Sequence, residues 1–281
     1  MDPQIAMYLA AVVIVGYTFL GGFSAVCWTD FFQGMLVLGS MFIAPIFAAF
    51  MLDTSSMSSL PGGYLNPFSS WQDIVSGLAW GLGYFGMPHI IIRFMSIKPQ
   101  KDLKKSAKIG IKWTLLIVFF ATLIGVIGRL FLGFDESINE NSLVFIQIVR
   151  KIFPGVISGI LLSAVLAASM STADSQLLAA SSAFSSDVYK PVIRKGKASD
   201  KEMMWTGRIV VLGISVAALI IASNPNAGSI MALVSNAWGI FGAAFGPAIM
   251  LSLFWKRFNF KGAVAGIITA VSYTHLTLPT K

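Results

Sequence analysis

The sequence predicts an all-α polytopic membrane protein. Its composition is 56% hydrophobic and only 11% charged, with a mean hydropathy of +0.78, whereas a soluble globular domain carries about 25% charged residues. Apolar runs of about 20 residues, the length that a helix needs to cross a bilayer, recur along the chain. We expect membrane segments over residues 5–20, 31–52, 74–95, 113–134, 157–179, 208–223, 230–255 and 263–273.

Basic residues gather in alternate connections between these segments. The connections 96–112, 190–208 and 256–261 are rich in lysine and arginine, whereas those of opposite parity carry mainly acidic residues. Because cytoplasmic loops of membrane proteins carry an excess of Lys and Arg, we expect these three connections to be cytoplasmic. The expected location is a cell membrane, with the lipid bilayer as a partner. This distribution accounts for the net charge of +8 without a nucleic-acid partner.

Several classes of chemistry lack their usual residues. Cys27 is the single cysteine, and the histidines are His89 and His275, so the sequence offers no disulfide framework and no transition-metal site. The chain contains neither a GxxxxGK[ST] nucleotide loop nor the Ser/His/Asp order of a hydrolase. We therefore expect no enzyme, no catalytic residue and no cofactor.

A glycine-rich stretch interrupts the third segment. Residues 77–89 read GLAWGLGYFGMPH, which is poor material for a straight helix. A broken helix is tolerated at membrane depth only where protein or a watery cavity surrounds it. Trp80, Tyr84 and Pro88 recur every four residues and share roughly one helical face. The pattern predicts either a solute site on a discontinuous helix or a glycine-rich face that packs on a neighbouring helix.

Small and hydroxyl side chains share one face of the fifth segment. Ala168, Ser171, Thr172 and Ser175 have the i, i+3, i+4 and i+7 spacing of a single helix face. Two adjacent hydroxyls beside a small residue suit sodium, a hard cation that prefers oxygen ligands. The alternative is that these hydroxyls bond back to their own helix or join it to a neighbour.

Two aspartates accompany the apolar segments. Asp174 lies inside the fifth segment, three residues after Ser171, and an ionisable residue there commonly marks an ion path. Its alternative role is a carboxylate near the cytoplasmic helix end that reaches a polar pocket or a lysine. Asp30 opens the second segment, where an acidic residue is the ordinary N-cap or dipole partner. We hypothesise that Asp174, Ser171 and Asp30 form a second cation site or an exit station.

Taken together, these motifs resemble the sodium/solute symporter family and its proline-transporting members. The matching stretches follow one another in order over nearly the whole chain: residues 17–23 with 28–30, 80–89 with 93–95, 159–164, 170–172, 187–190 and 237–247. The resemblance implies part of an inverted-repeat bundle of five plus five helices, with a broken helix at the solute site. It also implies that the chain is an internal fragment, with a single bundle over 1–273 and a non-family tail over 274–281.

The resemblance assigns roles by position. It implies that Ala168, Ser171 and Thr172 bind sodium, that Asp30 and Asp174 serve a second cation or coupling, and that Trp80, Tyr84 and Pro88 bind the solute. Two positions depart from the family pattern, namely Met87 in place of a usual Gln and Asn236 in place of a common aromatic residue.

The function that the resemblance implies is sodium-coupled uptake of a small organic solute, with L-proline as the first candidate and sodium as the coupling ion. Pantothenate or urea is the alternative solute. The alternative function is a transporter-like sensor domain of a histidine kinase.

Overall fold

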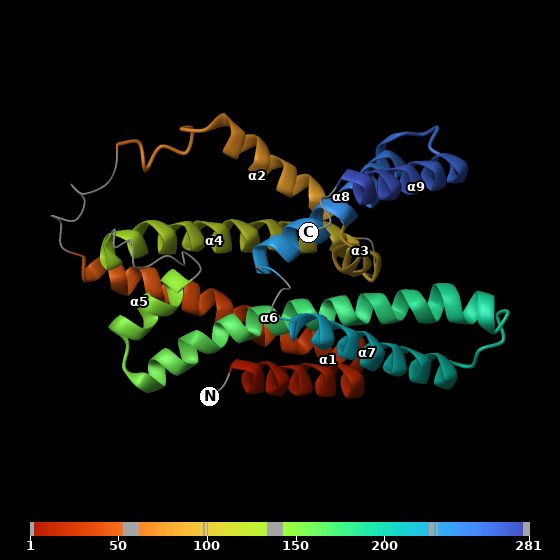
Figure 1. The fold of residues 1–281 in the computed structure, drawn as a ribbon, viewed down its shortest axis with the longest axis horizontal. Helices are drawn as coiled ribbons and strands as arrows, with labels where there is room; N and C mark the ends of the chain where they lie inside the picture. Colours follow the sequence, from red (N-terminus) through yellow and green to blue (C-terminus); the bar gives the residue numbers. More distant parts are fainter. Residues whose placement is uncertain are drawn as a thin grey trace. The chain divides into compact units, whose positions relative to one another are not determined.

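The computed structural model describes residues 3–52, 62–97, 99, 101–133, 143–224, 228 and 230–277. Within these residues the structure is helical and contains no strand (Figure 1). η2 is a 3-10 turn and η4 is a π-helical stretch. The elements in order are α1 (Pro3–Phe50), α2 (Trp71–Gly83), η2 (Tyr84–Gly86), α3 (Pro88–Met95), α4 (Lys101–Leu132), α5 (Val144–Ile152), α6 (Gly155–Ala183), η4 (Phe184–Ile193), α7 (Asp200–Ala222), α8 (Ile230–Phe254) and α9 (Phe260–Thr277).

Several of the described helices have the length and hydropathy of membrane spans. Five of them can cross a membrane, and the bent pair of Trp71–Gly86 and Pro88–Met95 makes a sixth if it is counted as one span. Each predicted segment lies mainly on helix. α1 contains the first segment and most of the second, and the shorter α9 contains the last. The prediction of an all-α, multi-pass membrane protein is confirmed.

The chain divides into two compact units, and each is described by itself. Unit 1 comprises Met1–Leu65 and Lys98–Leu178, and unit 2 comprises Asn66–Ile97 and Ala179–Lys281. The expectation of one bundle over residues 1–273 stays a prediction. Residues 278–281 of the expected tail lie outside the described residues, and the backbone before them is the end of α9.

α1 consists of two helices that meet at a sharp bend. Gly22 has φ 59° and ψ −157°, a conformation that glycine adopts without steric cost. Figure 1 shows the parts before and after Gly22 running in opposite directions. The expectation that Asp30 lies in the first turn of its helix was wrong. The helix resumes directly after Gly22, so Asp30 lies about two turns inside it and is not an N-cap.

The hydrophobic core of unit 1 lies where α1, α4, α5 and α6 meet. Its buried members are Ala44, Ala48, Ile124, Ile148, Val149 and Leu161. The two alanines of α1 let neighbouring helices approach closely, as small residues do in membrane bundles. α5 was not expected from hydropathy, because its 9 residues are fewer than a span requires. It contributes Ile148 and Val149, which are completely buried.

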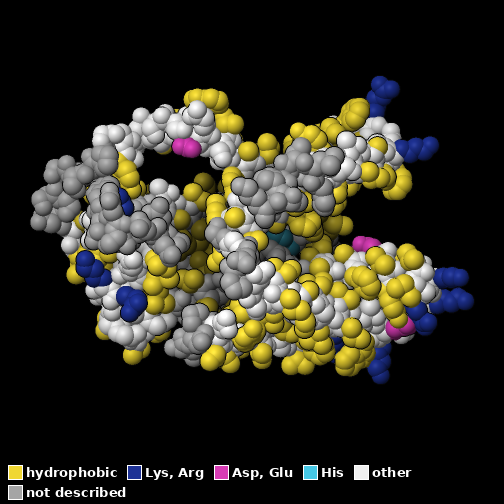
Figure 2. Space-filling view, in the orientation of Figure 1, with side chains coloured by type: hydrophobic (Ala, Val, Ile, Leu, Met, Phe, Trp, Pro, Cys, Tyr) yellow, Lys and Arg dark blue, Asp and Glu magenta, His cyan; other side chains and the backbone are white. Residues whose placement is uncertain are grey.

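Hydrogen bonds and an ion pair join the end of η4 to the start of α7 in unit 2. The Glu202 carboxylate accepts a hydrogen bond of 2.6 Å from the Tyr189 hydroxyl and lies 2.7 Å from Arg194 Nε. Ser199 caps α7 by accepting a bond of 3.3 Å from the Glu202 backbone N–H. On the face shown in Figure 2, hydrophobic side chains lie over α7 and basic side chains project where it begins. The polar end and the apolar body of this helix are therefore separated along its axis.

Candidate functional site

The third predicted segment is broken as its sequence indicates. α2 ends at Gly83, η2 covers Tyr84–Gly86, and α3 starts at Pro88, with a bend of 55° across the break. Pro88 occupies the first position of α3, where its missing N–H removes no helical hydrogen bond. The Met87 carbonyl accepts bonds of 3.1 Å from the N–H groups of Ile90 and Ile91, which starts the new helix. The prediction of a discontinuous helix is confirmed.

Aromatic side chains on this broken helix meet a partner on α8. The Trp238 indole N–H donates a bond of 3.3 Å to the Trp80 carbonyl oxygen. The Trp238 ring lies 5.8 Å from the Trp80 ring and 5.0 Å from the Tyr84 ring, between centroids. Trp80 and Tyr84 are thus brought together on Trp238, while Pro88 lies beyond the break. Trp238 received no role from the sequence, although it stands in a matching motif.

The glycines of the broken helix fall into two groups. A side chain on Gly83 would come within 2.5 Å of the Trp238 ring, and one on Gly86 would collide with the backbone of Phe241. Gly77 and Gly81 have no described neighbour within 4 Å of the same position. Of these four glycines, Gly83 and Gly86 pack closely on α8 and Gly77 and Gly81 do not. The broken helix therefore has both the glycine packing face and the aromatic face that the sequence offered as alternatives.

The predicted sodium residues place three oxygen atoms together on α6, in unit 1. The Ser171 and Thr172 hydroxyls donate to the same acceptor, the Ala168 carbonyl oxygen, at 3.1 and 3.0 Å. This is the back-bonding that the alternative predicted. It also directs both hydroxyl hydrogens into the helix, so the oxygen lone pairs remain for a cation. The arrangement can therefore serve both roles.

Asp174 is completely buried on the neighbouring face of α6. Its side chain is 0% exposed. Oδ2 accepts a bond of 2.6 Å from the Tyr17 hydroxyl of α1, and Oδ1 lies 3.2 Å from Ser175 Oγ. Ser175 Oγ also donates to the Ser171 carbonyl oxygen at 2.7 Å, which connects the carboxylate to the predicted sodium residues. Asp174 is therefore held in a polar pocket by Tyr17, and it forms no ion pair with a lysine of the described residues.

Two further polar residues of α1 interact with Tyr17 or Asp174. Asp30 interacts electrostatically with both residues, and Gln33 interacts with the Tyr17 hydroxyl. Thr18 Oγ1 and Gln33 Oε1 are buried without a hydrogen-bond partner in the described part of the chain. The structure thus brings Asp30 and Asp174 into one polar cluster. Tyr17 was quoted in a sequence motif but was given no role there.

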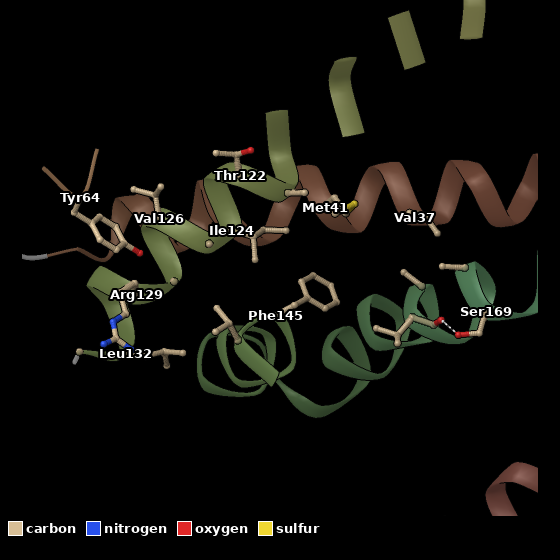
Figure 3. A pocket seen from close by; sticks show the side chains of 18 residues that line it. Val37, Met41, Tyr64, Thr122, Ile124, Val126, Arg129, Leu132, Phe145 and Ser169 are labelled. Atoms are coloured by element: carbon tan, nitrogen blue, oxygen red, sulfur yellow. Dashed lines mark hydrogen bonds between the residues drawn. The ribbon is translucent and has the colours of Figure 1, made fainter. Parts of the chain in front are cut away.

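A cavity of about 1120 Å³ lies elsewhere in unit 1. Figure 3 shows Tyr64 and Arg129 toward one end of its wall and Ser169 toward the other. The Ser169 hydroxyl donates to its own helix, to the Val165 carbonyl oxygen at 3.0 Å. Of the predicted sodium residues, the lining includes Ala168 only. This largely apolar cavity does not coincide with the oxygen cluster.

Comparison with known proteins places the chain in a family. Residues 1–270 match the Sodium:solute symporter family, and the chain belongs to it. A solved structure of a Na⁺-coupled sialic acid symporter, in a substrate-bound outward-open state with a novel Na⁺ site, has the same fold with a TM-score of 0.74. At 20% identity it covers 100% of this chain and 68% of that chain.

Curated relatives share more of the sequence. The chain is 42% identical to the high-affinity proline transporter PutP of Bacillus subtilis over 97% of this chain and 59% of the relative. It is 42% identical to the osmoregulated proline transporter OpuE of the same organism, over 96% and 56%. A sodium/proline symporter of Staphylococcus aureus is 40% identical over 96% and 54%. The chain therefore spans somewhat more than half the length of these relatives.

Proposed function

We propose that this chain acts in sodium-coupled uptake of L-proline, with sodium as the coupling ion and without covalent chemistry. The observation that carries the proposal is the 42% identity to a Bacillus subtilis high-affinity proline transporter over 97% of the chain. Membership of the Sodium:solute symporter family supports the coupling ion.

Sodium binds the oxygen cluster on α6 in this proposal. Ala168 contributes its carbonyl oxygen, and Ser171 and Thr172 contribute hydroxyl oxygens whose hydrogens are directed at that carbonyl. Oxygen atoms of backbone and hydroxyl groups are ligands that a hard cation prefers. Groups outside this cluster complete the coordination sphere.

A second cation, or the same ion on its exit, binds beside Asp174, Ser171 and Asp30. The burial of Asp174 supports this role, because a buried carboxylate in a membrane protein is costly unless a positive charge balances it. In the described part of the chain its donors are the neutral hydroxyl groups of Tyr17 and Ser175. A cation between the two aspartates removes their mutual repulsion.

L-proline binds at the aromatic face of the broken helix, against Trp80, Tyr84 and Pro88. The contacts of Trp80 and Tyr84 with Trp238 support a pre-formed aromatic surface at this position. Such a surface suits the apolar ring of the solute. Met87 is buried beside it, so it is placed to influence solute choice.

The basic connections face the cytoplasm. Figure 1 draws the connection after η4 and the connection between α8 and α9 at the same end of unit 2, which supports a common side for both. Sodium binding favours an outward-open state, and joint occupancy permits the change to an inward-open state. A potential of about 100 mV contributes about 2.3 kcal/mol for each full charge that crosses.

Uptake in liposomes tests the proposal. The complete open reading frame that contains this chain is expressed and reconstituted, and labelled L-proline uptake is measured with an inward sodium gradient and with a potassium gradient. We expect uptake with sodium only. Sodium-driven uptake of pantothenate or urea in place of proline would overturn the solute, and proline binding without uptake would favour a sensor. A histidine-kinase domain in the same reading frame would support the sensor function.

A further inference from the structure

α4 extends well beyond the length that a membrane requires. The helix has 32 residues, which at about 1.5 Å per residue is about 48 Å. The hydrocarbon core of a bilayer is about 30 Å thick, so about 18 Å of helix, or about 12 residues, projects from it. The apolar part begins at Trp113, which is half-buried. Its ring packs next to Gly34 of α1, since a Cβ atom added to that glycine would lie 3.3 Å from the ring. Residues 103–112 are all exposed.

The projecting part of α4 carries a continuous basic face. Each residue of an α-helix is rotated by about 100° from the one before it, and this places the five lysines on an arc of about 100° around the helix axis. Leu103, Ala107 and Ile111 lie on a separate face, and Asp102 is the single acidic residue of the helix. None of the lysines forms an ion pair with another residue in the described part of the chain. The members of this lysine face are Lys101, Lys104, Lys105, Lys108 and Lys112.

We propose that the lysine face binds the anionic headgroups of phospholipids in the cytoplasmic leaflet. The charge is complementary, and clusters of four to eight basic residues next to a membrane helix attract anionic lipid. The position is suitable because Lys112 directly precedes the apolar part, and a lysine there extends its ammonium group into the headgroup layer. The inference rests on the proposed orientation of the chain and is independent of the solute and of sodium.

The geometry predicts a gradient along the lysine face. Lys108 and Lys112 lie within about 7.5 Å of the hydrocarbon boundary at Trp113, which is about the thickness of the headgroup layer. Lys101 lies about 16 Å farther out than Lys112, which is about twice the screening length at physiological salt. Lipid contact should therefore depend on Lys108 and Lys112 and hardly on Lys101 and Lys104.

Lipid selectivity tests the proposal without transport. The protein from the complete open reading frame is placed in bilayers with spin-labelled phosphatidylglycerol or phosphatidylcholine, and the relative association of each lipid is measured. We expect the parent protein to prefer phosphatidylglycerol. In the double variant Lys108→Gln with Lys112→Gln this preference should fall by up to about fivefold for each lysine removed. The matched variant Lys101→Gln with Lys104→Gln, which loses the same charge, should keep the preference. Salt at about 1 M should abolish it.

Three results would overturn the proposal. Absence of a preference in the parent protein would leave the lysine face to a soluble acidic partner. Equal losses in the two double variants would indicate a general charge effect and not headgroup contact. Labelling of Ser106→Cys, in a Cys27→Ser background, by an impermeant maleimide from outside would place the face on the other side of the membrane. None of these results bears on sodium-driven proline uptake, which is measured separately.

Discussion

Gly86 provides the sharpest test of how the broken helix is held. In Gly86→Ala the new methyl group collides with the Phe241 carbonyl oxygen, and it lies 2.7 Å from the Phe241 carbonyl carbon and 2.9 Å from Gly242 Cα. All three atoms belong to the backbone of α8, so no side chain can rotate away. Carbon atoms pack best at about 3.5–4.0 Å, so the break and α8 must separate by roughly 1 Å.

The expected cost follows from that collision. Overpacking of this kind costs about 1–3 kcal/mol of unfolding free energy. The separation also weakens the 3.3 Å bond from Trp238 to the Trp80 carbonyl oxygen and the ring contact with Tyr84. We therefore expect Gly86→Ala to lower thermal stability and to raise the proline concentration for half-maximal uptake.

Gly77→Ala and Gly81→Ala are matched controls in α2. Both positions are open within 4 Å in the described structure, and alanine gains up to about 1 kcal/mol over glycine inside a helix. Stability is measured as the temperature at which half of the detergent-purified protein remains monodisperse. The reasoning is refuted if Gly86→Ala is as stable as the controls and takes up proline as the parent does.

Five further variants test the remaining assignments. Ser171→Ala and Thr172→Ala should each raise the sodium concentration for half-maximal uptake roughly tenfold, because each removes one oxygen ligand. Tyr84→Ala should raise the half-maximal proline concentration and leave sodium dependence unchanged. Asp174→Asn should lower the charge moved per proline, measured as a flux ratio, or slow sodium release. Tyr17→Phe removes the donor to Asp174 Oδ2 and should cost about 1.5–3 kcal/mol of stability.

Each of these expectations has an opposing result. Unchanged sodium dependence in both hydroxyl variants would remove the oxygen cluster from the sodium site. A Tyr84 variant with normal proline affinity would move the solute elsewhere. A normal flux ratio, sodium Hill coefficient and rate in Asp174→Asn would reduce that carboxylate to a structural role. Wild-type stability of Tyr17→Phe would mean that the hydrogen bond contributes little, with Tyr17→Leu as the control for ring packing.

Local properties of the chain were predictable from the sequence. Hydropathy identified the membrane segments, since crossing a bilayer is a requirement on composition and length. The four glycines and the proline of residues 77–89 indicated the break, because their effect on a helix acts over a few neighbouring residues. The convergence of Ser171 and Thr172 follows from helical spacing alone. The start of the second helix in α1 escaped prediction, because the sequence between residues 20 and 31 does not indicate that the helix resumes directly after Gly22, and this misplaced Asp30.

Composition, glycine and proline positions and helical spacing were enough to predict the class of protein, the broken helix and the oxygen-rich face of α6. The residues that these features contact depend on how the helices pack. Tyr17 and Asp174 are 157 positions apart, and Trp238 and Trp80 are 158 positions apart. Such pairs form because helices pack through shape and hydrogen bonds in three dimensions, and no periodicity along one helix encodes its partner. Helix packing also gives Gly83 and Gly86 close neighbours on α8 and leaves Gly77 and Gly81 open, a difference that the sequence does not reveal.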